Sequence, residues 1–149
     1  MTMCDIKRWK ADRGSSQIEF AFIAVMFIIV LLGIVEMGRM VLVYTSVANA
    51  ARVGARYAIV HGADRTGTGV DGPSGTGSTT QVETVVKNFA RAGLLDTTKL
   101  TITVTYPNGN GPGKKVDVTV TYPYDPLVPY YSSLLGKTVG STSEGVITF

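Results

Sequence analysis

The sequence predicts an α+β protein, in which a long N-terminal transmembrane α-helix is followed by a small domain with one helix and a roughly three-stranded antiparallel sheet. The first observation is an apolar run of sixteen uncharged residues, FAFIAVMFIIVLLGIV, at positions 20–35. The second is an apolar stripe at helical spacing that begins near residue 80. The third is a pair of segments, residues 100–106 and 116–122, in which apolar side chains alternate with threonine or aspartate.

A basic leader, residues 1–14, precedes the apolar run. The leader has a net charge of +2, whereas residues 15–149 together have a net charge of +1. Basic residues beside a membrane span stay in the cytoplasm, so we expect the N-terminus inside and the C-terminal part outside. The rest of the chain has no basic patch of the kind that binds nucleic acid. The four basic leader residues are Lys7, Arg8, Lys10 and Arg13.

The sequence predicts one continuous helix over residues 15–61, which spans the membrane in its first half, about residues 18–42. The sixteen-residue run alone covers only about 24 Å of a hydrocarbon core about 30 Å thick. Apolar residues resume at 40–44, and no proline or cluster of turn residues interrupts positions 15–60. Glu36 and Arg39 are three residues apart on one face, where they can pair at the outer membrane edge.

A cleaved signal peptide is the main alternative for this N-terminal region. Residues 48–50, Ala-Asn-Ala, match a small-x-small cleavage site in outline. The site lies thirteen residues beyond the apolar run, past Glu36 and Arg39. Because signal peptidase cuts close to the end of the apolar segment, we favour a retained membrane helix.

A short motif stands where the leader meets the apolar run: Gly14, four further residues, Glu19 and the aromatic Phe20. The motif falls within residues 13–14 (RG) and 18–21 (IEFA), and two further segments accompany it, 33–39 (GIVEMGR) and 49–58 (NAARVGARYA). In these segments the chain resembles the TadE/TadG-like pseudopilins of the tight-adherence (Flp) pilus system, which have a class III, prepilin-type signal. Members of this family often have a proline near the position of Val25, and this chain has none there.

The resemblance implies a pilin-like fold and cleavage between Gly14 and Ser15 by a prepilin peptidase. Cleavage would remove the charged leader and leave a new positively charged amine on Ser15. Glu19 lies one helical turn further on, where its carboxylate can face this amine or that of a neighbouring subunit. Glu19 and Phe20 are therefore the predicted assembly residues. The alternative for Glu19 is a carboxylate that only reaches the lipid headgroups.

The resemblance also implies partners and a location. The partners are the prepilin peptidase, other pilin or pseudopilin subunits and the inner-membrane pilus assembly platform, with membrane lipid around the helix. The location is the bacterial cytoplasmic (inner) membrane, as a single-pass protein with its C-terminus outside, or the cell-surface pilus.

Small side chains recur every four residues in the second half of the helix, at Ser46, Ala50, Gly54 and Ala58. A ridge of small residues lets another element approach the helix closely. We expect the sheet domain of the same chain to cover this ridge, and packing against another subunit is the alternative.

Residues 62–79 contain six glycines and predict a flexible Gly-rich linker, and residues 80–149 form the exported α+β domain. Its helix begins at Thr80, with Glu83 in a capping box, and stops at Gly93. A turn-rich connector, PNGNGPGKK, joins the two alternating segments as an antiparallel hairpin. We expect a short helical turn at 132–135 and the last strand within 138–149.

The chain lacks the residue pattern that nucleophilic or metal catalysis needs. Its one histidine is His61, its one cysteine is Cys4 in the leader, and it has no G-x-S-x-G motif. We therefore predict a non-enzymatic protein without metal or cofactor. The leading hypothesis is a pseudopilin or minor pilin subunit that takes part in assembly of a tight-adherence type IV pilus. The alternatives are a major pilin that forms the filament and a signal-anchored extracytoplasmic binding module.

Overall fold

The computed structural model describes residues 3–75, 77–93, 95–127 and 138–148, and it describes side chains from Ser15 onward except that of Val70. These residues confirm the predicted class, with a long helix, a second helix and a three-stranded antiparallel sheet. The chain divides into two compact units, Met1–Gly38 and Arg39–Phe149. The boundary falls inside the long helix, so the part of that helix from Arg39 onward belongs to the same unit as the sheet.

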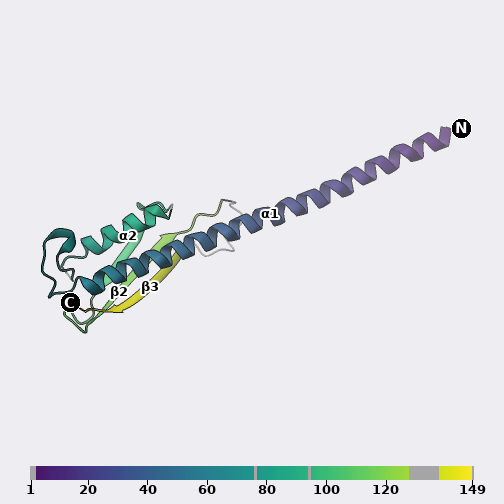
Figure 1. Cartoon of the computed structure of the whole chain (residues 1–149). Coiled ribbons are helices and arrows are strands. Elements are labelled where there is room, and N and C mark those ends of the chain that lie inside the picture. Colours follow the sequence, from purple (N-terminus) through teal and green to yellow (C-terminus); the bar gives the residue numbers. More distant parts are fainter. Residues whose placement is uncertain (1–2, 76, 94, 128–137, 149) are drawn as a thin grey trace. The chain divides into compact units, whose positions relative to one another are not determined.

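The first helix, α1, runs from Met3 to Val60 (Figure 1). It therefore begins twelve residues before Ser15, the predicted start. The reason lies in the leader composition: residues 3–13 contain neither proline nor glycine, and lysine, arginine, alanine and methionine are good helix formers. Gly14 costs only about 1 kcal/mol in a helix interior, which is too little to end it.

The second unit is built around the C-terminal part of α1. Figure 1 shows the second helix, α2 (Thr80–Ala92), and the sheet alongside this part of α1. Alanines form most of the α1 surface in the core, where Ala50, Ala51 and Ala58 are fully buried. Valines face them from α2 and from the sheet, so a core of small and β-branched side chains holds the three elements together.

The α2 helix begins at Thr80 and ends before Gly93, as the sequence predicts. The predicted capping box is wrong. The residue in the N-cap position is Thr79, and its hydroxyl donates to the Glu83 carboxylate at 2.9 Å instead of accepting from a backbone N–H. A one-residue difference in the start of the helix moves the glutamate out of the position that a capping box requires.

The sheet has the order β1-β2-β3, with both pairs antiparallel. Its strands are β1 (Thr101–Thr105), β2 (Lys115–Pro123) and β3 (Thr138–Val146). Val116, Val118 and Val120 of β2 are fully buried, whereas Asp117 and Thr119 between them are half-buried on the opposite face, as the alternation predicts. The predicted helical turn at 132–135 lies outside the described residues.

The glycine-rich segment 62–79 makes more contacts than its composition predicts. It contains a 3-10 turn, Gly69–Asp71, and the fully buried Ser74. The Ser74 N–H donates to the His61 carbonyl at 2.6 Å, and the Asn110 amide donates to the Ser74 carbonyl at 2.8 Å. These bonds attach the segment to the end of α1 and to the hairpin connector.

Candidate functional site: the N-terminal helix and its exported end

The predicted processing site, Gly14–Ser15, lies within the continuous helix α1. Ser15 is exposed. A protease must unwind helical backbone before it can cut, and glycine is the residue at which unwinding is easiest. Cleavage at this bond stays a prediction.

The predicted assembly residues, Glu19 and Phe20, are both exposed, with 72% of Phe20 accessible. Glu19 is four residues from Ser15 on α1, which places the two on the same helix face. This spacing allows a carboxylate to approach an amine on residue 15. The assembly role of the two residues stays a prediction.

The apolar run of α1 exposes nearly all of its large side chains, such as Phe22, Met26 and Ile34. In the described part of the chain, one helix is long and apolar enough to cross a membrane, with a mean hydropathy of 2.9 in its most apolar window. Apolar side chains exposed at this density need lipid or other helices around them. The N-terminal helix is therefore consistent with a single-pass membrane anchor.

The predicted membrane-edge residues have different surroundings. Glu36 is only 2% exposed. Arg39 is half-buried, and its guanidinium carbon lies 5.8 Å from the ring centroid of Tyr124. At this distance the cation is attracted by the ring face. Pairing of Glu36 with Arg39 stays a prediction.

The small-residue ridge lies largely inside the second unit. Ala50 and Ala58 are fully buried, Gly54 is buried and Ser46 is half-buried. A Cβ atom on Gly54 would lie 2.5 Å from Val86 Cγ2 and 3.0 Å from Val118 Cγ1. The ridge thus allows α2 and β2 of the same chain to approach α1, which is the first of the two arrangements that the sequence leaves open.

A buried polar cluster at the end of α1 was not predicted from the sequence. The Ser74 hydroxyl donates to the His61 carbonyl at 2.9 Å, and the Tyr106 hydroxyl, 3.0 Å away, can then donate to Ser74 Oγ. The ring of His61 stacks on Tyr57 with a centroid distance of 3.8 Å, and its Nδ1–H donates to the Tyr57 carbonyl at 2.8 Å. These residues are far apart in the sequence, so no local motif indicates their contact.

This cluster fastens the loop to the helix and does not form a nucleophilic pair. Ser74 bonds to the backbone carbonyl of His61 and not to its ring, so the imidazole is not placed to accept the serine proton. Burial raises the pKa of Tyr106, and the hydrogen bond with Ser74 acts in the opposite direction. Burial also raises the pKa of Tyr57, with Asp71 adding to the effect. Both phenols are therefore neutral at physiological pH.

The described residues contain no group of three or more histidine, cysteine, aspartate or glutamate side chains that could hold a metal ion. Lys87 pairs with Glu83 on α2 at 3.9 Å, and Lys99 pairs with Asp125 at 3.6 Å, both with substantial exposure. Exposed pairs of this kind contribute little to stability.

Comparison with known proteins gives one match, to the family model described as TadE-like protein, over residues 14–56. The N-terminal helix of this chain is TadE-like. The match confirms the resemblance seen in the sequence over this segment. The TadE-like segment includes Glu19, Glu36 and most of the small-residue ridge, but it does not extend to α2 or the sheet. No curated protein and no solved structure matches the chain significantly.

Proposed function

We propose that the chain is a non-enzymatic pseudopilin or minor pilin subunit, which a prepilin peptidase cuts between Gly14 and Ser15 and which takes part in assembly of a tight-adherence type IV pilus. The observation that carries this proposal is the TadE-like match, which begins at Gly14 itself. The matched segment thus starts at the predicted cleavage site and leaves the basic leader outside.

The chemistry of the junction supports the proposal. Removal of the leader takes away a net charge of +2 and creates a positive amine on Ser15, one helical turn from Glu19. In a membrane, an unpaired carboxylate is costly and a paired one much less so. A carboxylate that pairs with the amine of a neighbouring subunit would set the axial offset between two helices.

The charges also support an orientation. The leader lysines and arginines hold the N-terminus in the cytoplasm, so the second unit lies outside the inner membrane. The apolar part of α1 then meets lipid before assembly and other subunits after it.

The test is the N-terminus of the full chain after co-expression with a prepilin peptidase. Intact-mass measurement and N-terminal peptide mapping should show a chain that begins at Ser15. Gly14→Val should block the cut, because a branched side chain does not fit where a protease cleft needs bare backbone. Gly38→Ala is the matched control in the same helix and should be cut normally. A wild-type chain that still begins upstream of Ser15 in the presence of active peptidase contradicts the proposal.

A further inference from the structure

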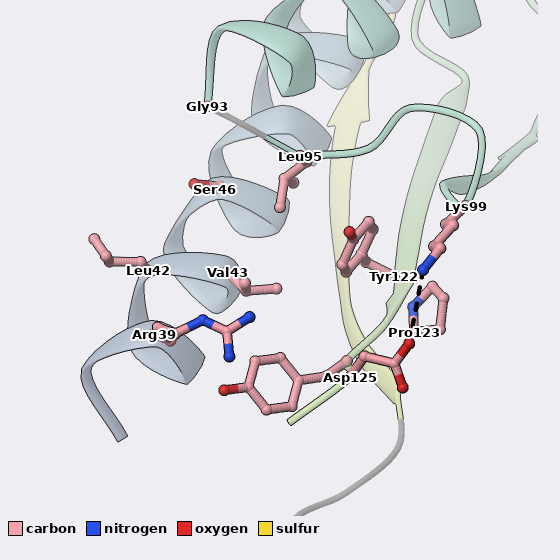
Figure 2. Close-up of a pocket in the computed structure, with 11 residues that line it drawn as sticks. Arg39, Leu42, Val43, Ser46, Gly93, Leu95, Lys99, Tyr122, Pro123 and Asp125 are labelled. Atoms are coloured by element: carbon pink, nitrogen blue, oxygen red, sulfur yellow. Dashed lines mark ion pairs between the residues drawn. The ribbon is translucent and has the colours of Figure 1, made fainter. Parts of the chain in front are cut away.

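The second unit contains a cavity of about 420 Å³ (Figure 2). The first residue of its lining along the chain is Arg39, which follows the apolar run. This volume falls in the range of small-ligand sites, about 300–1,000 Å³. One wall is a face of α1 that begins at Arg39. The other walls are the segment after α2, which includes Leu95 and Lys99, and the end of β2 with residues 122–125.

Among the described residues that line the cavity, the charged groups are two cations and one carboxylate. The Arg39 guanidinium lies over the Tyr124 ring, and Lys99 Nζ is 3.6 Å from Asp125 Oδ2. Figure 2 shows Arg39 and Lys99 on opposite walls. Asp125 is 91% exposed and Lys99 is 50% exposed, so water screens their attraction. Cations thus outnumber anions among these described lining residues, and an anion can compete with Asp125 for Lys99.

Apolar and aromatic groups line most of the rest of the cavity, together with Ser46. Leu42 is 68% exposed, although it is a leucine in the second unit, and Val43 and Tyr122 are half-buried beside it. Tyrosine rings, basic side chains and exposed leucines together are typical of the membrane–water interface, where one end of a site is apolar and the other wet.

Along the chain, Arg39 stands just beyond the apolar run of α1. Twenty residues, Phe20 to Arg39, follow Glu19. At 1.5 Å per residue they extend about 30 Å, the thickness of the hydrocarbon core. If Glu19 marks the inner surface, Arg39 reaches the outer one, at the depth of the lipid headgroups.

We propose that this cavity binds the headgroup of an anionic phospholipid from the outer leaflet of the membrane that α1 crosses. Arg39 and Lys99 contact the phosphate, and Leu42 lies beside the upper part of the acyl chains. The site holds the exported domain against the bilayer at a defined height. The inference rests on the membrane insertion of α1 in the proposed function, but not on cleavage or on a role in the pilus.

The test uses the full chain in phosphatidylcholine nanodiscs that contain a photoreactive lipid, either phosphatidylglycerol or phosphatidylcholine with the reactive group on the headgroup. Mass spectrometry maps the crosslinked residues. We expect headgroup crosslinks at residues 95–99 and 122–125 from phosphatidylglycerol in excess over phosphatidylcholine. Lys99→Gln should lower this ratio about fivefold, the change expected for one basic residue near an anionic surface, and high salt should lower it too.

Three variants sharpen the test. Lys87→Gln is the matched control, because Lys87 is 47% exposed and pairs with a carboxylate at 3.9 Å but does not line the cavity, and it should leave the ratio unchanged. Asp125→Asn should raise the ratio, because it removes the carboxylate that competes with the phosphate. Arg39→Gln should lower it, and circular dichroism should show that each variant keeps its fold.

The outcomes distinguish failure of the headgroup site from failure of membrane insertion. Equal crosslinking by the two lipids, or no crosslinks in the cavity, overturns the headgroup site. Loss of the crosslinks when free glycerol phosphate is added overturns the membrane as the source. A second set of nanodiscs, with the reactive group on the acyl chain, reports on insertion: if this probe does not crosslink residues 20–35, the membrane insertion on which both proposals depend is wrong. Headgroup crosslinks equal for both lipids but with normal insertion leave the pilin role standing.

Discussion

At the scale of single residues, the contact between Ser74 and Tyr106 joins the glycine-rich segment 62–79 to the residue that follows β1. Both side chains are buried, with 4% of Tyr106 exposed. A buried hydroxyl without a partner costs about 1–3 kcal/mol, and Ser74, which also bonds to the His61 carbonyl, provides the partner of the Tyr106 hydroxyl. The sequence shows Ser74 only as one polar residue in a flexible segment, because the contact that gives it a role comes from a residue 32 positions away.

We predict that Tyr106→Phe destabilises the full chain by about 1 kcal/mol at neutral pH, because Ser74 loses a hydrogen-bond partner. Burial raises the pKa of Tyr106, so the folded state holds the phenol proton more tightly than the unfolded state. The stability that this proton provides is present below pH 10 or about that value, the ordinary pKa of tyrosine, and is lost as the pH rises further.

The measurement is denaturant unfolding in detergent micelles at neutral and alkaline pH. Tyr106→Phe should lose less stability at alkaline pH than the wild type. Tyr44→Phe is the control, because Tyr44 is 55% exposed, and it should follow the wild-type curve. An equal alkaline loss in wild type and Tyr106→Phe would contradict the argument.

At the scale of elements, α1 has two surroundings along one unbroken helix. Its apolar run exposes large side chains, whereas its C-terminal part presents alanine and glycine to α2 and β2. The change in residue size along the helix explains the difference: large side chains suit lipid or other helices, and small ones allow a sheet to approach the backbone. Gly54 is the position where this approach is closest.

We predict that Gly54→Ala destabilises the second unit by about 1–2 kcal/mol. The added methyl group would overlap Val86 and crowd Val118. Overpacking costs about 1–3 kcal/mol, and the better helix propensity of alanine offsets up to about 1 kcal/mol of it. Gly38→Ala, in the same helix with nothing within 4 Å of the new Cβ, should be neutral or slightly stabilising. Thermal unfolding of the two variants in one detergent gives the comparison, and an unchanged midpoint for Gly54→Ala would show that the contact can relax.

The strands were the elements easiest to predict. In β2 the valines alternate with polar residues, and an antiparallel sheet with one buried face imposes the same period. The first residue of α2 was predicted correctly as Thr80, but the capping box was not. A shift of one residue decides which threonine stands at the N-cap and whether Glu83 lies three residues after it. The start of α1 was predicted too late, because the leader is itself helical and no proline separates it from the apolar run.

At the scale of the whole molecule, the proposed function makes the apolar part of α1 an assembly element and not only a tether. We predict that Glu19→Gln leaves membrane insertion and the fold of the second unit intact but lowers incorporation into pilus complexes roughly tenfold or more, since a charge-assisted hydrogen bond contributes about 1.5–3 kcal/mol. Glu144→Gln, an exposed glutamate of β3, is the control and should incorporate normally.

Co-purification with other pilus subunits gives this measurement, with membrane fractionation as the check on insertion. Normal incorporation of Glu19→Gln would count against the assembly role. A chimera in which an unrelated signal anchor replaces residues 1–38 separates the remaining alternative: a chimera that keeps full function indicates a tethered binding module.

The sequence by itself determined the features that depend on local composition and period: the apolar helix, its TadE-like motif, the amphipathic α2 and the alternating strands. Each of these follows from residues close together in the chain, because the spacing of their side chains indicates which face of the helix or strand is apolar. Only the tertiary structure decided that α2 and β2 cover the small-residue ridge, that Ser74 anchors the loop, and that Arg39, Lys99 and Tyr124 meet at one cavity. These features depend on contacts between residues far apart in the sequence, which exist only after the core valines and alanines have brought the elements together.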